Sequence, residues 1–599
     1  MSGMPAAIQT ISANHATYTV AVTGPGGVNI RKLGKGQIGI DVAGSTAAST
    51  VSIVQTSTSS QSNGSLLPVA RIRATSGQIG QVFGLRTVNL VGTANFTGSV
   101  GSLQVAAVGR SAQIIASGGL GSLIVGGAIN LGPQGKIAVA GDLAGNLQAG
   151  SINLDGGKIQ VGHNLGNLAV GSLTVARGGL LSIGGGAGTI AVSGDTSVAA
   201  GSVNIGEDAG SLSFGHNLGI APGGRIGIGR DVLSTATVGG GVSIDAGQLF
   251  VGRDLAGSLR VNGDLAIVDG GNLTVGRDVS GGLAVNGNLG LSLGGFVAVG
   301  RSFGGLGLTV GGNLTTGAGS TIRVGGNLAA LAVGGTITGQ DGGVDMTVGL
   351  DLNNFSVAGG AANAGGVENF NLDVGKNIVG LNVAHGLFND FITAGVLITN
   401  VNVGADGPVA VFDTEIRAGV QITNAAFNGD VKSDRPINPL GRRTRIIAGE
   451  DRLGGFEIGG NMVNVTVSGS LIDAVLVASV QPTGGDGSVQ VSPSTLPPTG
   501  PDYYDAPAGG VYRRVANLGL PYAAPPFDRT IDPAVHNRVL PGTINRNFFQ
   551  PPKPDGTIVY PTTSTVLGGV ITTVHANNSD YAGLFAADTS GVFAGTLPS

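Results

Sequence analysis

The sequence predicts an all-β chain that is mostly a long parallel β-helix, with three short strands in each coil of about 21–26 residues. Two observations predict this fold class. Glycine supplies 112 of the 599 residues while 41% of the chain is hydrophobic, a combination typical of many short strands joined by tight turns. A short apolar strand followed by glycine also recurs at a nearly constant spacing.

The repeat is read from matching strings such as IQVGHNL from Ile159, LFVGRDL from Leu249 and LTVGRDV from Leu273. The glycine that ends each of these strands falls at positions 162, 184, 206, 229, 252, 276, 300, 325 and 349. Between two of these positions lie a second strand, which ends in Gly-Asp or Gly-Asn, and a third strand, which ends in a glycine-rich corner. Three strands and three corners describe one turn of a triangular coil, so Val251 and Val275 should stack in the core of adjacent coils.

Stacking explains why such a chain folds, because one coil cannot bury its inward side chains and a column of coils can. Glycine at the corners is expected to adopt positive φ, and the neighbouring Asp or Asn to bond its own backbone. On this basis Asp264, Asn288 and Asn313 should form a ladder with one residue per coil, and Asn327 should lie at a different corner. A leucine-rich horseshoe has a similar period, but this glycine content would destabilise the helix or extended arc on its outer side.

Three regions are expected along the chain. Residues 1–40 form an N-terminal cap or a segment that offers strands to a neighbour, residues 41–480 the β-solenoid, and residues 481–599 a C-terminal cap or assembly arm. The last region holds 16 of the 24 prolines and six of the seven tyrosines, and proline interrupts strand ladders. Its candidate assembly contacts are Tyr503, Tyr504, Tyr512, Arg513, Arg514 and Tyr522.

A recurring Arg-Asp pair is the most conspicuous polar feature of the repeat. Stacked coils would align these residues as an arginine column beside an aspartate column, which relieves repulsion between like charges. The prediction is a solvated, self-neutralising ladder, and a strip that binds a charged ligand is the alternative. Its members are Arg230, Asp231, Arg253, Asp254, Arg277, Asp278 and Arg301.

Catalytic and metal-binding signals are sparse. The densest polar group outside the regular repeat comprises Asp373, Asp390, Asp413, Glu415 and Arg417, and a catalytic cleft would be expected there if anywhere. His163 and His216 share the string GHNL but belong to different strands, so they do not predict a zinc site. There is no cysteine, and no catalytic residue, metal or cofactor is expected. Calcium binding at the isolated Gly-Gly-Asp-Gly of residues 484–487 is the one metal site that the sequence leaves possible.

Charge and hydropathy limit the partners. The net charge is −4 and the pI near 5.9, which argues against a nucleic-acid partner. No stretch of 18 apolar residues predicts a membrane span, and the first 25 residues lack the pattern of a cleaved signal peptide. Self-association is expected, because a solenoid ends in open strand edges. A cell-surface polysaccharide is a second possible partner.

The strings VGGNL from Val310 and Val324 and VNGDL from Val261 resemble those of bacterial glycine-rich β-solenoid proteins that are secreted or displayed at the cell surface. The resemblance covers about three quarters of the chain and implies extracellular or cell-surface location, adhesion or assembly, with no catalytic residue. Two functions therefore stay open. One is an extracellular structural or adhesive rod, with self-assembly into a filament or surface layer as a further option. The alternative is a carbohydrate-active β-helix enzyme or polysaccharide-binding module.

Overall fold

A computed structural model describes residues 7–13, 16–34, 36–58, 66–74, 77–339, 345–359, 366–405, 408–433, 444–448, 461–472, 475–478, 488–490, 511–513, 571–579 and 591–593. The chain divides into two compact units. Unit 1 comprises Met1–Gly287 and Leu293–Gly300, and unit 2 comprises Asn288–Ser292 and Arg301–Ser599.

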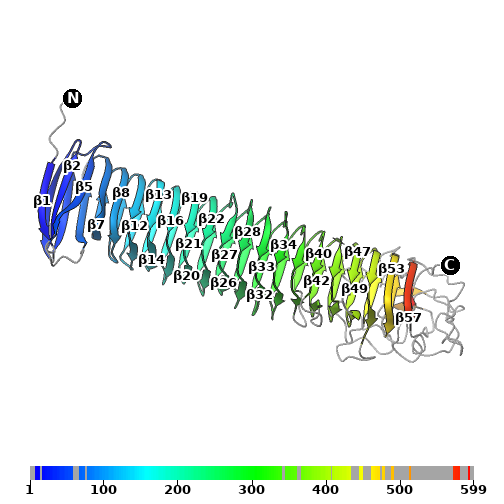
Figure 1. The fold of residues 1–599 in the computed structure, drawn as a ribbon. Helices are drawn as coiled ribbons and strands as arrows, with labels where there is room; N and C mark the ends of the chain where they lie inside the picture. The colour runs from blue at the N-terminus through cyan, green and yellow to red at the C-terminus, as the bar shows by residue number, and fades with distance from the viewer. Residues whose placement is uncertain are drawn as a thin grey trace, which may run out of the picture. The chain divides into compact units, whose positions relative to one another are not determined.

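The predicted fold class is confirmed: the described residues form an all-β parallel β-solenoid of about 15 coils, with three strands per coil and no helix. Figure 1 shows the strands of each unit as successive rungs. A strand in one coil pairs in parallel with the corresponding strand of the next, so three sheets run along the stack. We call them the first, second and third faces, in the order in which the chain crosses them within a coil.

Unit 1 begins with a group of five longer strands, followed by three strands that lead into the regular coils. The first eight strands are β1 (Ala7–Ala13), β2 (Ala16–Thr23), β3 (Gly27–Gly34), β4 (Gln37–Ala43), β5 (Thr50–Thr58), β6 (Leu67–Ala74), β7 (Ile79–Phe96) and β8 (Val100–Val108). The first face then holds β9 (Gln113–Ala116), β12 (Lys136–Val139), β15 (Lys158–Val161), β18 (Leu180–Ile183), β21 (Ser202–Ile205), β24 (Arg225–Ile228), β27 (Gln248–Val251), β30 (Asn272–Val275) and β33 (Phe296–Val299). The second holds β10 (Leu120–Val125), β13 (Leu143–Ala149), β16 (Leu165–Val170), β19 (Ala187–Val192), β22 (Ala209–Phe214), β25 (Ala236–Val238), β28 (Ser258–Val261) and β31 (Gly282–Val285). The third holds β11 (Ala128–Leu131), β14 (Ser151–Asp155), β17 (Leu173–Ala176), β20 (Thr196–Ala199), β23 (Leu218–Ala221), β26 (Val242–Asp245) and β29 (Leu265–Val268).

Unit 2 has the same three-face pattern, with strands of two to twelve residues. Its first face holds β36 (Thr321–Val324), β39 (Met346–Val348), β42 (Asn371–Val374), β46 (Phe391–Ala394), β49 (Glu415–Ala418), β52 (Arg445–Ala448), β54 (Val475–Ala478) and β58 (Gly591–Phe593). Its second holds β34 (Leu308–Val310), β37 (Leu331–Val333), β40 (Phe355–Val357), β44 (Leu381–Val383), β47 (Leu397–Val403), β50 (Gln421–Phe427), β53 (Asn461–Ile472) and β57 (Ile571–Ser579). Its third holds β32 (Leu289–Leu291), β35 (Leu314–Thr316), β38 (Ile337–Thr338), β41 (Val367–Glu368), β45 (Leu387–Phe388), β48 (Val409–Phe412) and β51 (Asp430–Lys432), and β43 (Asn377–Ile378), β55 (Ser488–Gln490) and β56 (Val511–Arg513) lie outside these three series.

The register predicted from the repeat is confirmed in unit 1. β27 and β30 pair in parallel with Val251 opposite Val275, and both valines are buried, at 6% and 5% exposure. Along these strands buried and half-exposed residues alternate, because successive side chains of a strand point to opposite sides of the sheet. The inward Leu, Ile and Val columns of all three faces therefore form one continuous core within the unit.

The glycines that end the first-face strands are required for close approach and not, as expected from the sequence, for positive φ. A Cβ atom at Gly252 would lie 2.1 Å from the carbonyl oxygen of Gly229, and one at Gly276 would lie 2.1 Å from that of Gly252. Neither Gly252 nor Gly276 has positive φ. The backbones of adjacent coils thus touch at this corner, and any side chain there would separate them.

Positive φ occurs instead at the corner after the third face, where it falls on glycines such as Gly178 and Gly270 and also on non-glycine residues. In unit 1 the non-glycine residues are Arg177, Ala200, Ala246, Asp269 and Leu293, with φ between 44° and 52°. A left-handed conformation costs alanine or leucine about 1 kcal/mol relative to glycine. A glycine follows each of them, so the strain at this corner is confined to one residue per coil.

The N-terminal strands differ from the coils because they pair mainly in antiparallel fashion. β1 pairs with β2, β2 with β5, and β3 with β4, and the first parallel pairs are β4 with β6 and β5 with β7. Tyr18, Val20, Ile40 and Ile53 are buried between these strands, with at most 2% exposure. The group β1–β5 therefore closes the apolar core at the first coil.

Candidate functional site

The Arg-Asp repeat forms a ladder in which Arg230, Arg253 and Arg277 each pair with an aspartate of the preceding coil. Arg253 Nη2 lies 3.5 Å from Asp231 Oδ2, and Arg277 Nη2 lies 3.2 Å from Asp254 Oδ2. The arginine side chains are 42% exposed while those of Asp231 and Asp254 are 13% and 23% exposed. The arginines are thus solvated, whereas the carboxylates are largely enclosed by the corner.

Each carboxylate of this column also accepts a hydrogen bond from the backbone of the next coil. The amide of Asp231 donates to Asp208 Oδ1 at 3.1 Å, that of Asp254 to Asp231 Oδ1 at 2.9 Å, and that of Asp278 to Asp254 Oδ1 at 3.1 Å. The aspartates therefore tie one coil to the next, where the sequence had suggested bonds within a single corner. Arg230 follows the same pattern, with its Nε 3.6 Å from Asp208 Oδ1.

A second ladder follows the corner after the second face and includes the predicted asparagines. The amide of Asn313 donates to Asn288 Oδ1 at 2.9 Å, and the amide of Thr336 donates to Asn313 Oδ1 at 2.9 Å. Asn327 lies at the other ladder, as predicted, where its Oδ1 accepts from the amide of Asp351. Asp264 lies at the corresponding corner of unit 1, where its carbonyl oxygen accepts from the amide of Val242. These polar columns hold the coils together.

The polar group expected to mark a cleft is buried. Asp373, Asp413, Glu415 and Arg417 are at most 9% exposed, and Asp390 is fully buried. Asp390 accepts hydrogen bonds from the backbone amides of Phe370 and Phe388, at 2.8 and 2.7 Å, so its carboxylate stabilises a corner. Asp373 accepts from the Thr393 hydroxyl at 3.0 Å. A substrate in solvent does not reach these carboxylates in this structure.

The most charged part of this group is a carboxylate between two arginines on the first face of unit 2. β49 places Glu415 and Arg417 on the same side of the strand, and their side chains form an ion pair. Glu415 Oε2 lies 3.0 Å from Nη2 of Arg445, which stands opposite Glu415 on β52. The Arg417 guanidinium also lies 5.2 Å from the ring centroid of Phe391. Sequence reasoning missed Arg445, because the partner strand comes 30 residues later and belongs to no regular repeat.

The described parts of the chain contain no group of three or more His, Cys, Asp or Glu side chains that could hold a metal ion. His163 and His216 are exposed at different corners, after the first and second faces. The Gly-Gly-Asp-Gly at residues 484–487 lies outside the described residues, so the calcium option stays a hypothesis.

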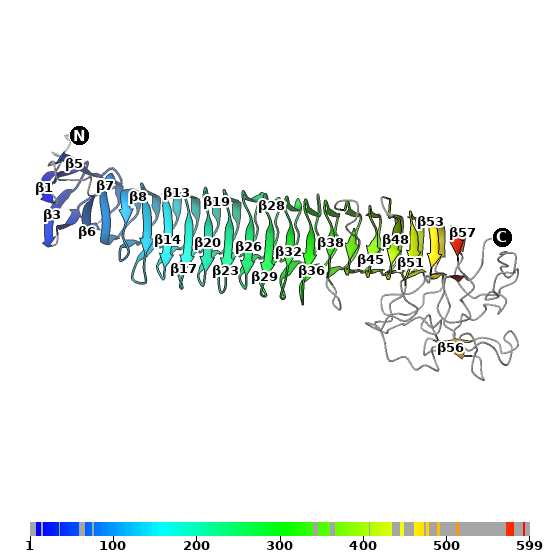
Figure 2. The ribbon, with the colours of Figure 1, turned by 60° about the horizontal axis from the view of Figure 1, so that its bottom comes forward.

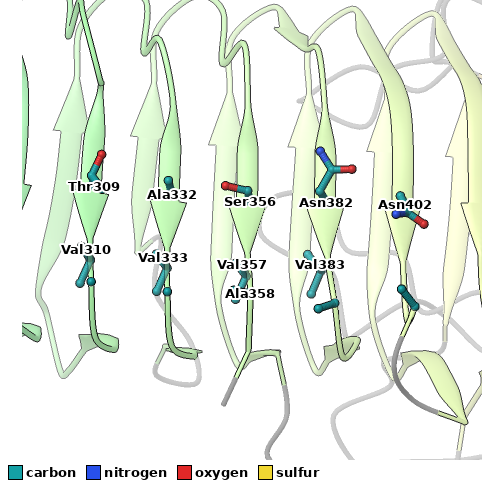
Figure 3. A pocket seen from close by; sticks show the side chains of 14 residues that line it. Thr309, Val310, Ala332, Val333, Ser356, Val357, Ala358, Asn382, Val383 and Asn402 are labelled. Atoms are coloured by element: carbon teal, nitrogen blue, oxygen red, sulfur yellow. The ribbon is translucent and has the colours of Figure 1, made fainter. Parts of the chain in front are cut away.

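An open groove of about 520 Å³ follows the second face of unit 2 across five coils. Figure 3 shows its lining: one row of outward side chains along successive strands, beside a row of valines at the strand ends. The outward row reads Thr309, Ala332, Ser356, Asn382 and Asn402. The lining contains no charged and no aromatic residue, so the groove suits a neutral, elongated ligand or surface.

Small residues occupy the corner of the groove that follows the second-face strands. In unit 1 the residue at this corner is mostly glycine, and it is Asn262 and Asn286 after β28 and β31, where the two side chains hydrogen-bond at 3.3 Å. In the groove the same position holds Gly311, Gly334, Ala358, Ala384 and Gly404, and Asn returns at Asn428. Because small residues such as Gly171 and Gly215 also occupy this column in unit 1, the sequence alone does not mark the position of the groove.

The predicted assembly residues fall mostly outside the described chain. Tyr503, Tyr504, Arg514 and Tyr522 lie there. Tyr512 and Arg513 belong to β56, which pairs antiparallel with β55, and Tyr512 is opposite Val489. Their role in assembly stays a prediction.

No protein-family model, no curated protein and no solved structure matches this chain. Among the described residues no helix has the length and apolar character needed to cross a membrane.

Proposed function

We propose that this protein is an extracellular structural or adhesive β-solenoid. The observation that supports this proposal is that the clustered carboxylates bind other groups of the protein itself. Asp231 and Asp254 tie coils together, Asp390 stabilises a corner, and Glu415 lies between two arginines. A hydrolase or lyase of polysaccharides needs acidic or basic groups that reach a bound substrate. The described faces instead present mainly small, neutral side chains, which suits a scaffold.

The location can be tested on intact cells that produce the protein. A protease added outside the cells should remove the chain from the surface, and antibodies against unit 1 should label unpermeabilised cells. A cytosolic marker serves as the control for lysis. Protection from the protease until the cells are broken would contradict the extracellular location. Turnover of a polysaccharide by the purified protein would contradict the structural role.

Polysaccharide binding is a second candidate because the groove on unit 2 is open, elongated and uncharged. The hydroxyl and amide groups of Ser356, Asn382 and Asn402 would hydrogen-bond the hydroxyls of a neutral glycan. A Ser356→Trp change should fill the groove and abolish binding to immobilised neutral polysaccharides. Ala191→Trp, on the second face of unit 1, is the matched control and should bind normally. Equal binding by both variants would exclude the groove as the site.

A further inference from the structure

The N-terminal group of strands has two terminal edges with different chemistry. β1 pairs with β2 and β3 pairs with β4, and among the described residues neither β1 nor β3 has a ladder on its other side. Figure 2 shows both strands at this end of unit 1. Natural edge strands are protected from pairing by charges, prolines or bulges. β3 carries exposed Arg31 and Lys32, whereas β1 has the sequence AIQTISA, with no charge and no proline.

The edge strand β1 is also fixed in position and carries an exposed apolar residue. Gln9 Oε1 accepts a hydrogen bond from the amide of Ile30 at 2.8 Å, which ties β1 to β3. Ile11 is buried at 8% exposure, whereas Ile8 is 63% exposed and Thr10 is exposed. A large exposed apolar residue on an unprotected strand is the feature that strand addition covers.

We infer that β1 is a docking edge for the β1 strand of a second copy of this chain, joined in antiparallel fashion about a two-fold axis through Thr10. This interface would serve the structural role proposed above, and its biological relevance rests on that role. In the pairing Thr10 faces Thr10, Ile8 faces Ser12 and Gln9 faces Ile11, so no charges of like sign meet. Opposed threonines are among the favourable cross-strand pairs. The sheet β1–β2–β5 is already antiparallel, so a further antiparallel strand continues its pattern.

The size of the edge sets the strength of the dimer. One pair of seven-residue strands buries less than the roughly 1,200 Å² of a standard stable interface, so the dimer should be weak and depend on concentration. A closed two-fold contact also stops at two copies, whereas a contact between β1 and a different strand would continue into a chain of copies.

Sedimentation equilibrium of the full-length protein over a range of concentrations tests the inference. The mass should rise from one to two chains of 58.6 kDa and no further. Thr10→Lys places two lysines opposite each other and should weaken dimerisation by roughly tenfold or more. Asn29→Lys, an exposed position on the already charged β3, is the matched control and should dimerise like the natural protein.

Mixing two variants tests the two-fold register itself. Thr10→Lys and Thr10→Glu should each be monomeric alone, and their mixture should form a heterodimer because Lys then faces Glu. Circular dichroism of both variants controls for folding. A monomer at every concentration, masses beyond two chains, or a Thr10→Lys variant that dimerises normally would each overturn the inference. None of these results bears on whether the protein is displayed outside the cell.

Discussion

Replacing Glu415 by Gln removes the carboxylate that two buried arginines share. The side chains of Glu415 and Arg417 are each 4% exposed and that of Arg445 is fully buried, so water cannot replace the lost charge. Removing one partner of a buried ion pair typically costs about 3–5 kcal/mol, because it leaves an uncompensated charge in the interior. We expect about 3 kcal/mol for Glu415→Gln, since the amide still accepts one hydrogen bond.

Hydrogen exchange measured by mass spectrometry resolves this effect along the chain. A loss of 3 kcal/mol should make exchange in β46, β49 and β52 roughly 100-fold faster, while the strands of unit 1 keep their protection. Glu207→Gln, at an exposed corner of unit 1, is the matched control and should change exchange little. If Glu415→Gln alters exchange in these strands by less than about fivefold, the cluster contributes nothing net to stability and the argument from burial is wrong.

Three further predictions concern unit 1. Val275→Asp should unfold the surrounding coils, since it buries an unpaired charge, whereas Thr274→Asp on the outer side of the same strand should be tolerated; circular dichroism and thermal melts distinguish the two. Replacing Arg253 and Arg277 by Gln should lower stability by at most about 1 kcal/mol per pair, because both guanidinium groups are half exposed; a much larger loss would contradict the solvated ladder and mean that it is buried or holds a partner. Burial raises the pKa of the Tyr18 phenol above its usual value of 10.0. The native state therefore holds this proton more tightly than the unfolded state does, and the stability of the fold should decrease as the pH rises above about 10. Tyr18→Phe should reduce that alkaline loss in thermal melts, and an unchanged pH profile would show that this phenol does not control it.

The fold was predictable because the spacing of the sequence repeat determines the length of one coil. The strings around Val251 and Val275 fix the spacing of one coil, and inward and outward positions then follow from the alternation along each strand. The separation of Asn327 from the column of Asn288 and Asn313 was also predictable, since it depends only on position within the coil.

Features that depend on contact between coils were not predictable in the same way. The glycine at position 252 was attributed to backbone dihedral freedom, but the structure requires it because the carbonyl of Gly229 lies too close for a side chain. The partnership of Glu415 with Arg445 joins strands whose spacing departs from the repeat, so no periodic pattern indicates it. The groove was not predictable either, because small residues such as Gly334 and Ala358 line it, and glycines such as Gly171 and Gly215 occupy the equivalent positions in unit 1.

Engineered disulfides test the stacking of parallel coils most directly, because the natural chain has no cysteine. Phe250 and Thr274 are direct partners on the outer side of β27 and β30, and Thr274 and Ala298 are partners on β30 and β33. Adjacent strands lie about 4.8 Å apart, within the range that a disulfide spans, and two coils span about 9.6 Å, which is beyond it.

We expect Phe250→Cys combined with Thr274→Cys to form a disulfide under mild oxidation, detected by mass spectrometry of the digested protein. Phe250→Cys combined with Ala298→Cys should stay reduced under the same conditions. Efficient linkage of the second pair, or none in the first pair while the protein remains folded, would contradict the stacked β-solenoid.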